Sequence, residues 1–450
     1  MKRRTFISTL AAGAALAAAT QVRAQSITSA RRRVGLIGCG WYGGVDLLRL
    51  AQVEPIDVVS LCDVDRDALV TTRKLVATWK GNEPETFGDY RQMLARRNLD
   101  IVLVATPDHW HALPAVAAMQ TGADVYLEKP VGVDVIEGDA LVAAARKYER
   151  VVQVGPQRRS MPHLVEARER IVRAGKLGRI GLVEGFCYWH MRSQDRTEGI
   201  EPPESLDYDM WTGPAPLRPF LGTMHPRGWR AFMEYGNGIM GDMGVHMVDM
   251  IRWMLGLGWP RAVTSSGGIH VHTDASANIT DTQLAIFDYG DLEITWQHRT
   301  WGLAPNPDEH WSKQWGAIIH GGNGTLRLTS VDYDFRSADD GGHIQRDADN
   351  EDIDRSNRNL DEVDLGAAPA ERQHMRDFLH AIDRRENPVA VIAEAHVSTA
   401  CCVLANLSME LGRTLRNHPE TRSIPDDAEA TARLRRPYRR PWVHPEPHRV

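Results

Sequence analysis

The sequence predicts an α/β protein whose N-terminal part is a doubly wound parallel sheet. A glycine-rich turn follows a strand and opens a helix at residues 33–63, and strands then alternate with helices as far as Gly155. Such alternation gives right-handed crossovers and parallel strands. The chain has 450 residues, 42% hydrophobic and 25% charged, which is the balance of a globular protein long enough for two domains.

The segment at residues 33–63 has the pattern of a dinucleotide-binding unit. The apolar run Val34–Ile37 is followed at once by Gly38-Cys39-Gly40-Trp41-Tyr42-Gly43, with G-x-G-x-x-G spacing. A helix start and a second apolar run, Ile56–Leu61, lead to Asp63, roughly 20 residues past the glycines. The complete order of strand, turn, helix, strand and acid is much more specific than the glycines alone.

Each part of this segment has a physical role at a dinucleotide. Gly38 permits the tight turn, Gly40 lets the backbone approach the pyrophosphate, and Gly43 lets the helix pack on the strand. The helix start at Trp41 and Tyr42 offers free N–H groups to the phosphates. Asp63 can accept both ribose hydroxyls of NAD but would repel a 2′-phosphate. NAD is therefore the expected cofactor, and NADP is the alternative.

The first 24 residues are predicted to be an export signal. Lys2-Arg3-Arg4 is a basic start, and Phe6–Ala19 is apolar but too short to span a membrane. Val22-Arg23-Ala24 is an acceptable cleavage site, so the mature chain should begin at Gln25 and keep no membrane anchor. The paired arginines resemble a twin-arginine signal, which would carry a folded, cofactor-loaded protein to the periplasm. An ordinary signal for unfolded export is the alternative.

Charge and cysteine content exclude several classes of protein. A net charge of -6 argues against nucleic acid as a partner. The cysteines are odd in number and nowhere spaced C-x-x-C, so they predict neither a disulfide framework nor a zinc site. They are Cys39, Cys62, Cys187, Cys401 and Cys402. Stability is therefore expected to come from the core alone.

The chain from Asp65 to Gly155 continues the alternating pattern. Helices are expected at 67–79, 90–96, 112–121 and 136–148, and strands at 100–105, 124–127 and 151–155. Ligands bind beyond the carboxyl ends of such strands. The segments at those ends should border the cofactor whatever the family is. They are Thr106-Pro107, Glu128-Lys129-Pro130 and Gly155-Pro156-Gln157.

Three residues suit the oxidation of an alcohol, which needs a base for the hydroxyl proton and a positive group for the developing alkoxide. Lys129 stands at a strand end, and His246 titrates in the range of a base near neutral pH. Asp242 lies four residues before His246, so on a helix it could orient the imidazole. It could equally be the N-cap of a helix over Met243–Leu255. Which of Lys129 and His246 takes the proton stays open.

Two patterns could suggest a metal site, and neither is convincing. His109 and His111 lie close together, but no third or fourth ligand stands at a metal-like spacing. The acidic stretch 336–369 lacks the glycine and the glutamate of a calcium loop. We therefore expect no metal, and a solvated loop at 336–369.

Two groups of motifs, one in each half of the chain, are shared with a known family. The first comprises Gly38 to Gly43, Thr106-Pro107 with His111, and Glu128-Lys129-Pro130. The second comprises Gly236-Asn237-Gly238, Gly241-Asp242-Met243-Gly244-Val245-His246 and Asp249. Together they resemble the glucose–fructose oxidoreductase and inositol dehydrogenase family (Gfo/Idh/MocA). The resemblance implies a Rossmann domain followed by an α/β domain with an open, largely antiparallel sheet.

The resemblance also implies a function. It suggests a nicotinamide cofactor, a carbohydrate substrate such as a sugar, polyol or glycoside, and a homo-oligomer, either a dimer or a tetramer. It assigns Lys129, Asp242 and His246 to the catalytic group. It gives Glu128 and Gln157 contacts with the nicotinamide half, and His111 matches the family's histidine after the Thr-Pro turn. The dinucleotide-binding domain would span 25–155.

The second domain is expected over 156–420, with an extended tail at 421–450. Helices are predicted at 161–174, 372–384 and 394–415, the last two packing beside the first domain as in the family. Strands are predicted at 180–189, 263–271, 282–300 and 316–328. Residues that could contact a sugar are His190, Arg192, Trp211 and Arg230. The basic tail is either a subunit contact or a frayed end.

These features predict an exported NAD-dependent oxidoreductase that acts on a sugar or glycoside hydroxyl. The alternative is a glycoside hydrolase that oxidises a ring carbon only transiently, to allow elimination of the leaving group. The intact Glu128-Lys129-Pro130 motif favours net oxidoreduction.

Overall fold

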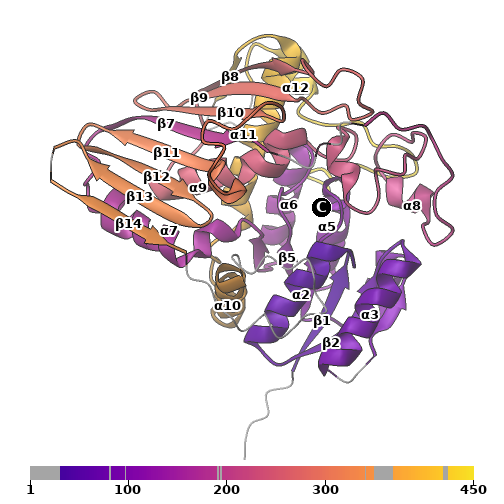
Figure 1. The fold of residues 1–450 in the computed structure, drawn as a ribbon. Helices are drawn as coiled ribbons and strands as arrows, with labels where there is room; N and C mark the ends of the chain where they lie inside the picture. Colours follow the sequence, from indigo (N-terminus) through magenta and orange to yellow (C-terminus); the bar gives the residue numbers. More distant parts are fainter. Residues whose placement is uncertain are drawn as a thin grey trace, which may run out of the picture.

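A computed structural model describes residues 31–80, 83–96, 98–189, 192, 195–339, 341–348, 368–418 and 424–450. These residues form two sheets, one in each half of the chain, with helices packed on them (Figure 1). The predicted export signal, 1–24, and the predicted sugar contact His190 lie outside the described residues.

The first sheet has six parallel strands in the order β3-β2-β1-β4-β5-β6. The order reverses between β1 and β4, which opens a crevice at their carboxyl ends. The strands are β1 (Arg32–Ile37), β2 (Ile56–Cys62), β3 (Glu85–Phe87), β4 (Ile101–Val104), β5 (Asp124–Leu127) and β6 (Val152–Val154). The helices between them are α2 (Trp41–Val53), α3 (Arg66–Lys80), α4 (Tyr90–Arg96), α5 (Ala112–Gln120) and α6 (Val135–Lys147). The predicted doubly wound sheet is confirmed.

The central strand of this sheet is apolar and is buried on both faces. Every residue of β4 is fully buried, because helices cover both faces of a parallel sheet. The edge strand β3 was not predicted. It has only three residues, of which Phe87 alone is buried, so it shows no apolar period.

The second sheet has nine strands in the order β14-β13-β12-β11-β7-β10-β9-β8-β15. Neighbours run antiparallel except β7 and β10, which are parallel. The strands are β7 (Ile180–Cys187), β8 (Ala262–Gly268), β9 (Thr282–Asp288), β10 (Glu293–Arg299), β11 (Trp315–Gly321), β12 (Gly324–Thr329), β13 (Asp332–Ser337), β14 (His343–Asp347) and β15 (Leu415–Arg416). The expected open, largely antiparallel sheet is confirmed.

Three predictions of where strands and loops begin and end in this half of the chain are wrong. Residues 282–300 and 316–328 each form a hairpin, β9–β10 and β11–β12, rather than one strand. The turns at Gly290-Asp291 and Gly322-Asn323 are dipeptides that favour tight hairpins. Both lie inside long alternating runs, which hid them. The stretch expected to begin a solvated loop at 336 instead completes β13 and forms β14 as far as Asp347.

Helices of the second half fill the space between the two sheets. Helix α10 (Ala368–Arg384) packs on α2, and α11 (Ile392–Leu411) packs on α6 and β8 (Figure 1). The predicted packing of the closing helices beside the first domain is therefore confirmed. Helix α11 is apolar enough to span a membrane, but 83% of its most apolar window is buried in the molecule. The remaining helices are α7 (Pro162–Ala167), α8 (Tyr208–Thr212), α9 (Val245–Leu255) and α12 (Ala428–Ala432).

The C-terminal tail is ordered over residues 424–450 and docks on its own chain. Trp442 meets Trp110 edge to face, with ring centroids 4.7 Å apart. His444 pairs with Asp134 at 2.9 Å, where α6 begins. The chain end lies beside α5 and α6 in Figure 1. The frayed-end alternative for the tail is wrong, because Trp442 and His444 pack against residues of the first domain.

Candidate active site

The turn between β1 and α2 leaves no room for a side chain at two of its three glycines. Gly38 has φ of +93°, and a Cβ there would lie 2.6 Å from the carbonyl carbon of Ala105. A Cβ on Gly43 would lie 2.0 Å from the carbonyl oxygen of Gly38. Beside Gly40 a Cβ would meet nothing within 4 Å. The three positions thus provide the tight turn, the close packing and the open approach that a dinucleotide needs.

Asp63 follows β2, and its carboxylate turns back toward the glycine turn. Its two oxygens accept the N–H of Cys39 at 2.6 Å and of Asp65 at 2.9 Å. Burial is the largest influence on this carboxyl group and raises its pKa, against the two N–H donors. Each oxygen keeps a further lone pair, so both can still accept ribose hydroxyls.

The glycine turn and Asp63 line one cleft with about 990 Å³ of space between its walls. Most of the predicted cofactor residues line this cleft together: Gly38, Gly40, Trp41, Tyr42, Asp63, Thr106 and Pro107. This space includes the open mouth of the cleft, so the lining residues, and not its size, mark it as a place for a cofactor.

A segment of the second half, residues 204–230, closes the other side of the cleft, and we call it the strap. His225 of the strap pairs with Asp65 at 2.8 Å. Arg227 lies with its guanidinium carbon 3.9 Å from the ring centroid of Trp41. Sequence reasoning missed the strap, because these contacts join distant parts of the chain and carry no motif.

Unpartnered polar atoms gather where the nicotinamide half would lie. Gln157 donates from Nε2 to the hydroxyl of Tyr42 at 2.9 Å. Its Oε1, Oγ1 of Thr106 and Oε1 of Glu128 are buried and have no hydrogen-bond partner in the described part of the chain. Buried polar groups are normally paired. A carboxamide bound here would supply such partners, so the residues present fit a nicotinamide dinucleotide.

Glu128 is uncharged near neutral pH. Burial raises its pKa to about 8, although the charge of Lys129 opposes the shift. Gly155 makes room for it, since a Cβ there would lie 2.1 Å from Oε1 of Glu128. A protonated carboxyl group can donate a hydrogen bond that a carboxylate cannot.

The predicted catalytic residues come together across the two domains. Lys129 follows β5, and its Nζ lies 2.7 Å from Oδ1 of Asp242 in the second half. Arg230 of the strap places its Nε 3.5 Å from Oδ2 of the same carboxylate. Asp242 lies in a π-helical turn, Met240–Gly244, and α9 begins only after it without a side-chain cap. The N-cap alternative is wrong, because this carboxylate pairs with cations instead.

His246 lies one turn further, at the start of α9. Its Nδ1 is buried without a hydrogen-bond partner among the described residues, and its ring meets Trp315 edge to face at 5.2 Å. Burial, assisted by the charges of Lys129 and Arg158, lowers the pKa of His246 well below its usual value. The imidazole is therefore neutral at physiological pH and has a lone pair for a proton, and the same lowering of its pKa makes it a weaker base than an exposed histidine.

Comparison with known proteins agrees with this geometry. The model of the Gfo/Idh/MocA oxidoreductase family, NAD-binding Rossmann fold, matches residues 32–156, and the model of the family's C-terminal alpha/beta domain matches 170–291. Together they cover more than half of the chain. This chain belongs to the Gfo/Idh/MocA family. Residues 32–156 form its NAD-binding Rossmann domain.

Several curated relatives match part of the chain. The rhizopine catabolism protein MocA of Rhizobium meliloti is 28% identical over 226 residues, 50% of this chain and 58% of the relative. A glycosyl hydrolase family 109 protein of Stenotrophomonas maltophilia is 34% identical over 139 residues, 30% of each chain. Inositol 2-dehydrogenase of Salmonella typhimurium is 30% identical over 159 residues, 35% of this chain and 46% of the relative. The chain thus spans about half the length of these relatives or less.

Solved structures share the fold at low identity. An oxidoreductase domain protein from Kribbella flavida superposes with a TM-score of 0.64 at 20% identity, covering 88% of this chain and 100% of the other. The WlbA dehydrogenase from Bordetella pertussis, in complex with NADH and UDP-GlcNAcA, gives 0.63 at 21% identity, covering 87% and 99%. These likenesses show the fold of the family.

The histidines after the Thr-Pro turn have structural partners. His111 lies between the carbonyl oxygens of Pro130 at 2.6 Å and Thr106 at 2.9 Å; burial lowers its pKa to about 4, so the neutral ring can donate to only one of them. Its expected contact with the cofactor stays a prediction. His109 faces the carbonyl oxygen of Trp211 at 3.1 Å.

The predicted sugar contacts have different surroundings. Trp211 and Arg230 line the cleft, and Arg230 adjoins the catalytic carboxylate. Arg192 is 5% exposed and donates to the carbonyl oxygens of Ala277 and Ile279, which is the role of a structural arginine. Of the three predicted sugar contacts that the structure describes, Trp211 and Arg230 line the cleft and Arg192 does not.

Sequence reasoning missed two residues beside His246. Arg158 lies with its guanidinium carbon 4.0 Å from the ring centroid of Trp315, which itself contacts His246. Arg158 comes shortly after the carboxyl end of a predicted parallel strand, where ligands bind, and that position could have found it. No such signal marks Trp315, which precedes a predicted strand of the other sheet.

Proposed function

We propose that this protein is an exported NAD-dependent oxidoreductase that moves a hydride between a sugar, polyol or glycoside carbon and the nicotinamide. One observation carries the proposal. The Lys129–Asp242 ion pair and the neutral His246 meet at the carboxyl end of the Rossmann sheet, beside unpartnered atoms that suit a nicotinamide. An alcohol placed there would meet a cation and a proton acceptor at once.

Each catalytic side chain has a distinct task in this proposal. The bound nicotinamide supplies the hydride acceptor. The neutral imidazole of His246 takes the hydroxyl proton, because its lowered pKa keeps it unprotonated. The ammonium of Lys129 stabilises the oxygen as negative charge develops there. Asp242 acts through Lys129, holding it at 2.7 Å.

The strap supports retention of the cofactor through turnover. Residues on both sides of the cleft, among them His225 and Asp65, join the strap to the Rossmann domain. A dinucleotide between them could leave only if the strap contacts opened. Retention also suits a periplasmic enzyme, since free nicotinamide cofactors are not expected to be abundant there.

The absorbance spectrum of the purified mature protein tests the function. We expect the band of reduced nicotinamide to appear when a responsive sugar or polyol is added without any added NAD. Protein that carries bound NAD but gives no reduced band with any sugar or polyol would contradict net oxidation.

A second candidate is an NAD-dependent glycosidase that oxidises the sugar transiently. The glycosyl hydrolase family 109 relatives favour it. It predicts release of the leaving group from a chromogenic glycoside with no net change in the nicotinamide band. The two functions therefore differ in one assay.

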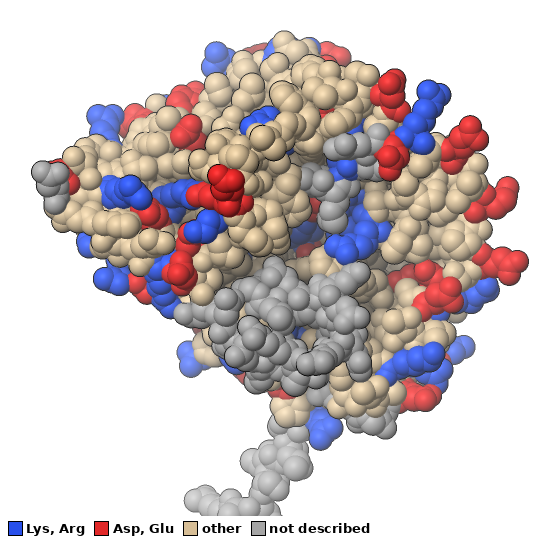
Figure 2. All heavy atoms as spheres, in the orientation of Figure 1, with Lys and Arg blue, Asp and Glu red and all other residues tan. Residues whose placement is uncertain are grey.

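Export and assembly are proposed on the sequence pattern alone. Changing Arg3 and Arg4 together to lysine should trap a folded precursor in the cytoplasm if the twin-arginine route is used. We also propose a homo-oligomer and a small neutral ligand rather than nucleic acid. Over the face drawn in Figure 2, acidic and basic side chains are interspersed, which supports the absence of a nucleic-acid surface there.

A further inference from the structure

Three tryptophans lead from the candidate base to the surface. Trp315 meets the ring of His246 at 5.2 Å, Trp189 meets Trp315 at 6.1 Å, and Trp311 meets Trp189 at 4.9 Å, all edge to face. Exposure rises along this series: His246 is buried, Trp315 and Trp189 are half-buried, and Trp311 is 48% exposed. The row is thus continuous with the site and open to solvent at its far end.

Packing of the core does not account for Trp311. It lies on a short turn, Trp311–Lys313, at the end of the loop that joins β10 to β11. About half of its surface stays in water. Single exposed aromatic residues are common on protein surfaces, and what distinguishes Trp311 is its place at the outer end of a row that reaches His246.

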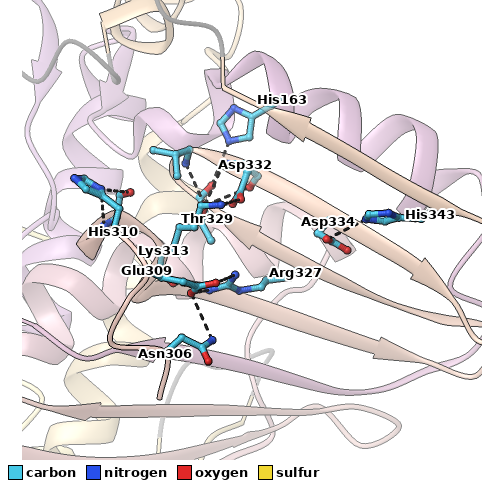
Figure 3. A network of polar contacts seen from close by, with 12 residues as sticks. His163, Asn306, Glu309, His310, Lys313, Arg327, Thr329, Asp332, Asp334 and His343 are labelled. Atoms are coloured by element: carbon cyan, nitrogen blue, oxygen red, sulfur yellow. Dashed lines mark hydrogen bonds and ion pairs between the residues drawn. The ribbon is translucent and has the colours of Figure 1, made fainter. Parts of the chain in front are cut away.

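The turn that carries Trp311 is firmly anchored (Figure 3). Glu309 pairs with Arg327 of β12 at 2.9 Å. Lys313 pairs with Asp332 of β13 at 2.7 Å. His310 caps the turn by accepting the N–H of Ser312. Charged contacts on both sides of the tryptophan hold its backbone in place, so the exposed ring is presented in one position before any ligand arrives.

We propose that Trp315, Trp189 and Trp311 form a subsite for the part of a glycoside that lies beyond the reacting ring. The C–H groups on the face of a pyranose carry partial positive charge and suit the negative face of an indole. Buried Nε1 of Trp189 has no hydrogen-bond partner among the described residues and can donate to a sugar oxygen. The preferred substrate is therefore a disaccharide or larger glycoside rather than a free monosaccharide. This inference rests on the proposed carbohydrate function.

The subsite can be tested without turnover by calorimetry on mature protein whose bound cofactor is NADH. The affinity for each disaccharide is compared with the affinity for the corresponding methyl glycoside. The pairs are maltose and methyl α-glucoside, cellobiose and methyl β-glucoside, and lactose and methyl β-galactoside. We expect at least one disaccharide to bind about tenfold more tightly than its methyl glycoside. Trp311→Ala should remove this preference without weakening binding of the methyl glycoside, and Trp311→Phe should keep part of it.

Leu303→Ala is the matched control, since Leu303 lies on the same loop and is 77% exposed. It should keep the preference. The subsite would be overturned if the wild-type protein bound no disaccharide more tightly than its methyl glycoside. It would also be overturned if Trp311→Ala kept that preference. Reduction of bound NAD by sugars, measured separately, distinguishes this from failure of the proposed oxidoreductase, because the binding ratio requires no redox step.

Discussion

Replacing Lys129 by methionine removes the ammonium group and keeps most of the bulk of the side chain. Methionine cannot reach Asp242 with a donor, so the 2.7 Å ion pair is lost while Arg230 stays 3.5 Å from the other carboxylate oxygen. The glycine turn and Asp63 are untouched. We therefore expect NAD binding to persist and hydride transfer to fail.

The structure sets the size of both effects. Loss of one preorganised group that stabilises a developing oxyanion typically costs about 10²–10³-fold in kcat. For stability, an unpaired buried polar group costs about 1–3 kcal/mol. The side chains of Lys129 and Asp242 are 14% and 9% exposed, and Arg230 remains as a partner, so we expect the lower part of that range. The folded fraction at 25 °C should hardly change.

Asp242→Asn tells whether the carboxylate acts through Lys129. Single-turnover reduction of bound NAD by a responsive sugar is measured for the two single variants and the double variant. If Asp242 only holds Lys129, the double variant should be no slower than Lys129→Met. Losses that multiply, or an unchanged rate in Lys129→Met, would refute the assignment. Leu303→Ala, remote from the pair, controls for general damage.

Three further changes have defined outcomes. Asp63→Ser should weaken NAD binding and favour NADP in a titration of apo-protein, because the carboxylate that accepts the ribose hydroxyls is lost; unchanged preference would contradict this. Since burial lowers the pKa of His246, kcat/KM for oxidation should not fall as pH drops through about 6.5. A fall in kcat/KM near that pH that is absent in His246→Ala would contradict a base that is neutral there. His246→Ala itself should lower kcat/KM about 10²–10⁴-fold. His225→Ala should loosen the strap and speed loss of bound NAD on dialysis, with thermal stability nearly unchanged; a wild-type rate of loss would show that the strap does not retain the cofactor.

The Rossmann half could be predicted because its signals are local. The glycines at 38–43 and the acid at 63 lie within one structural unit, and the apolar run at β4 has the length of a buried strand. The hairpins of the second sheet could not be separated so easily. Each tight turn only shifts the phase of the alternation, from buried odd-numbered residues such as Phe287 and Ile319 to buried even-numbered ones such as Ile294 and Leu326, and such a shift is easily overlooked in a sequence.

The geometry of the candidate site was predicted in part. Strand ends and motif singled out Lys129, Asp242 and His246, whose catalytic roles stay predictions. The partner of Asp242 was not foreseen, since residues four apart on a helix suggest a local pair, whereas the carboxylate in the π-helical turn pairs with Lys129. The strap and the tryptophan row depend on contacts between residues more than a hundred positions apart, such as Trp189 with Trp311. No local pattern records such a contact.

The two halves of the chain contribute different groups to the candidate site. The Rossmann half supplies the groups common to any dinucleotide, and its own turns fix them, as with Asp63 and the N–H of Cys39. In the proposed site the second half supplies most of the groups that would face a substrate, namely Arg230 from the strap, His246 from α9 and the tryptophans, and Lys129 comes from the Rossmann half. Changes in the strap or in the turn at Trp311 should therefore alter cofactor retention and substrate choice independently, because the strap contacts Asp242 and Asp65, whereas Trp311 reaches His246 only through Trp189 and Trp315.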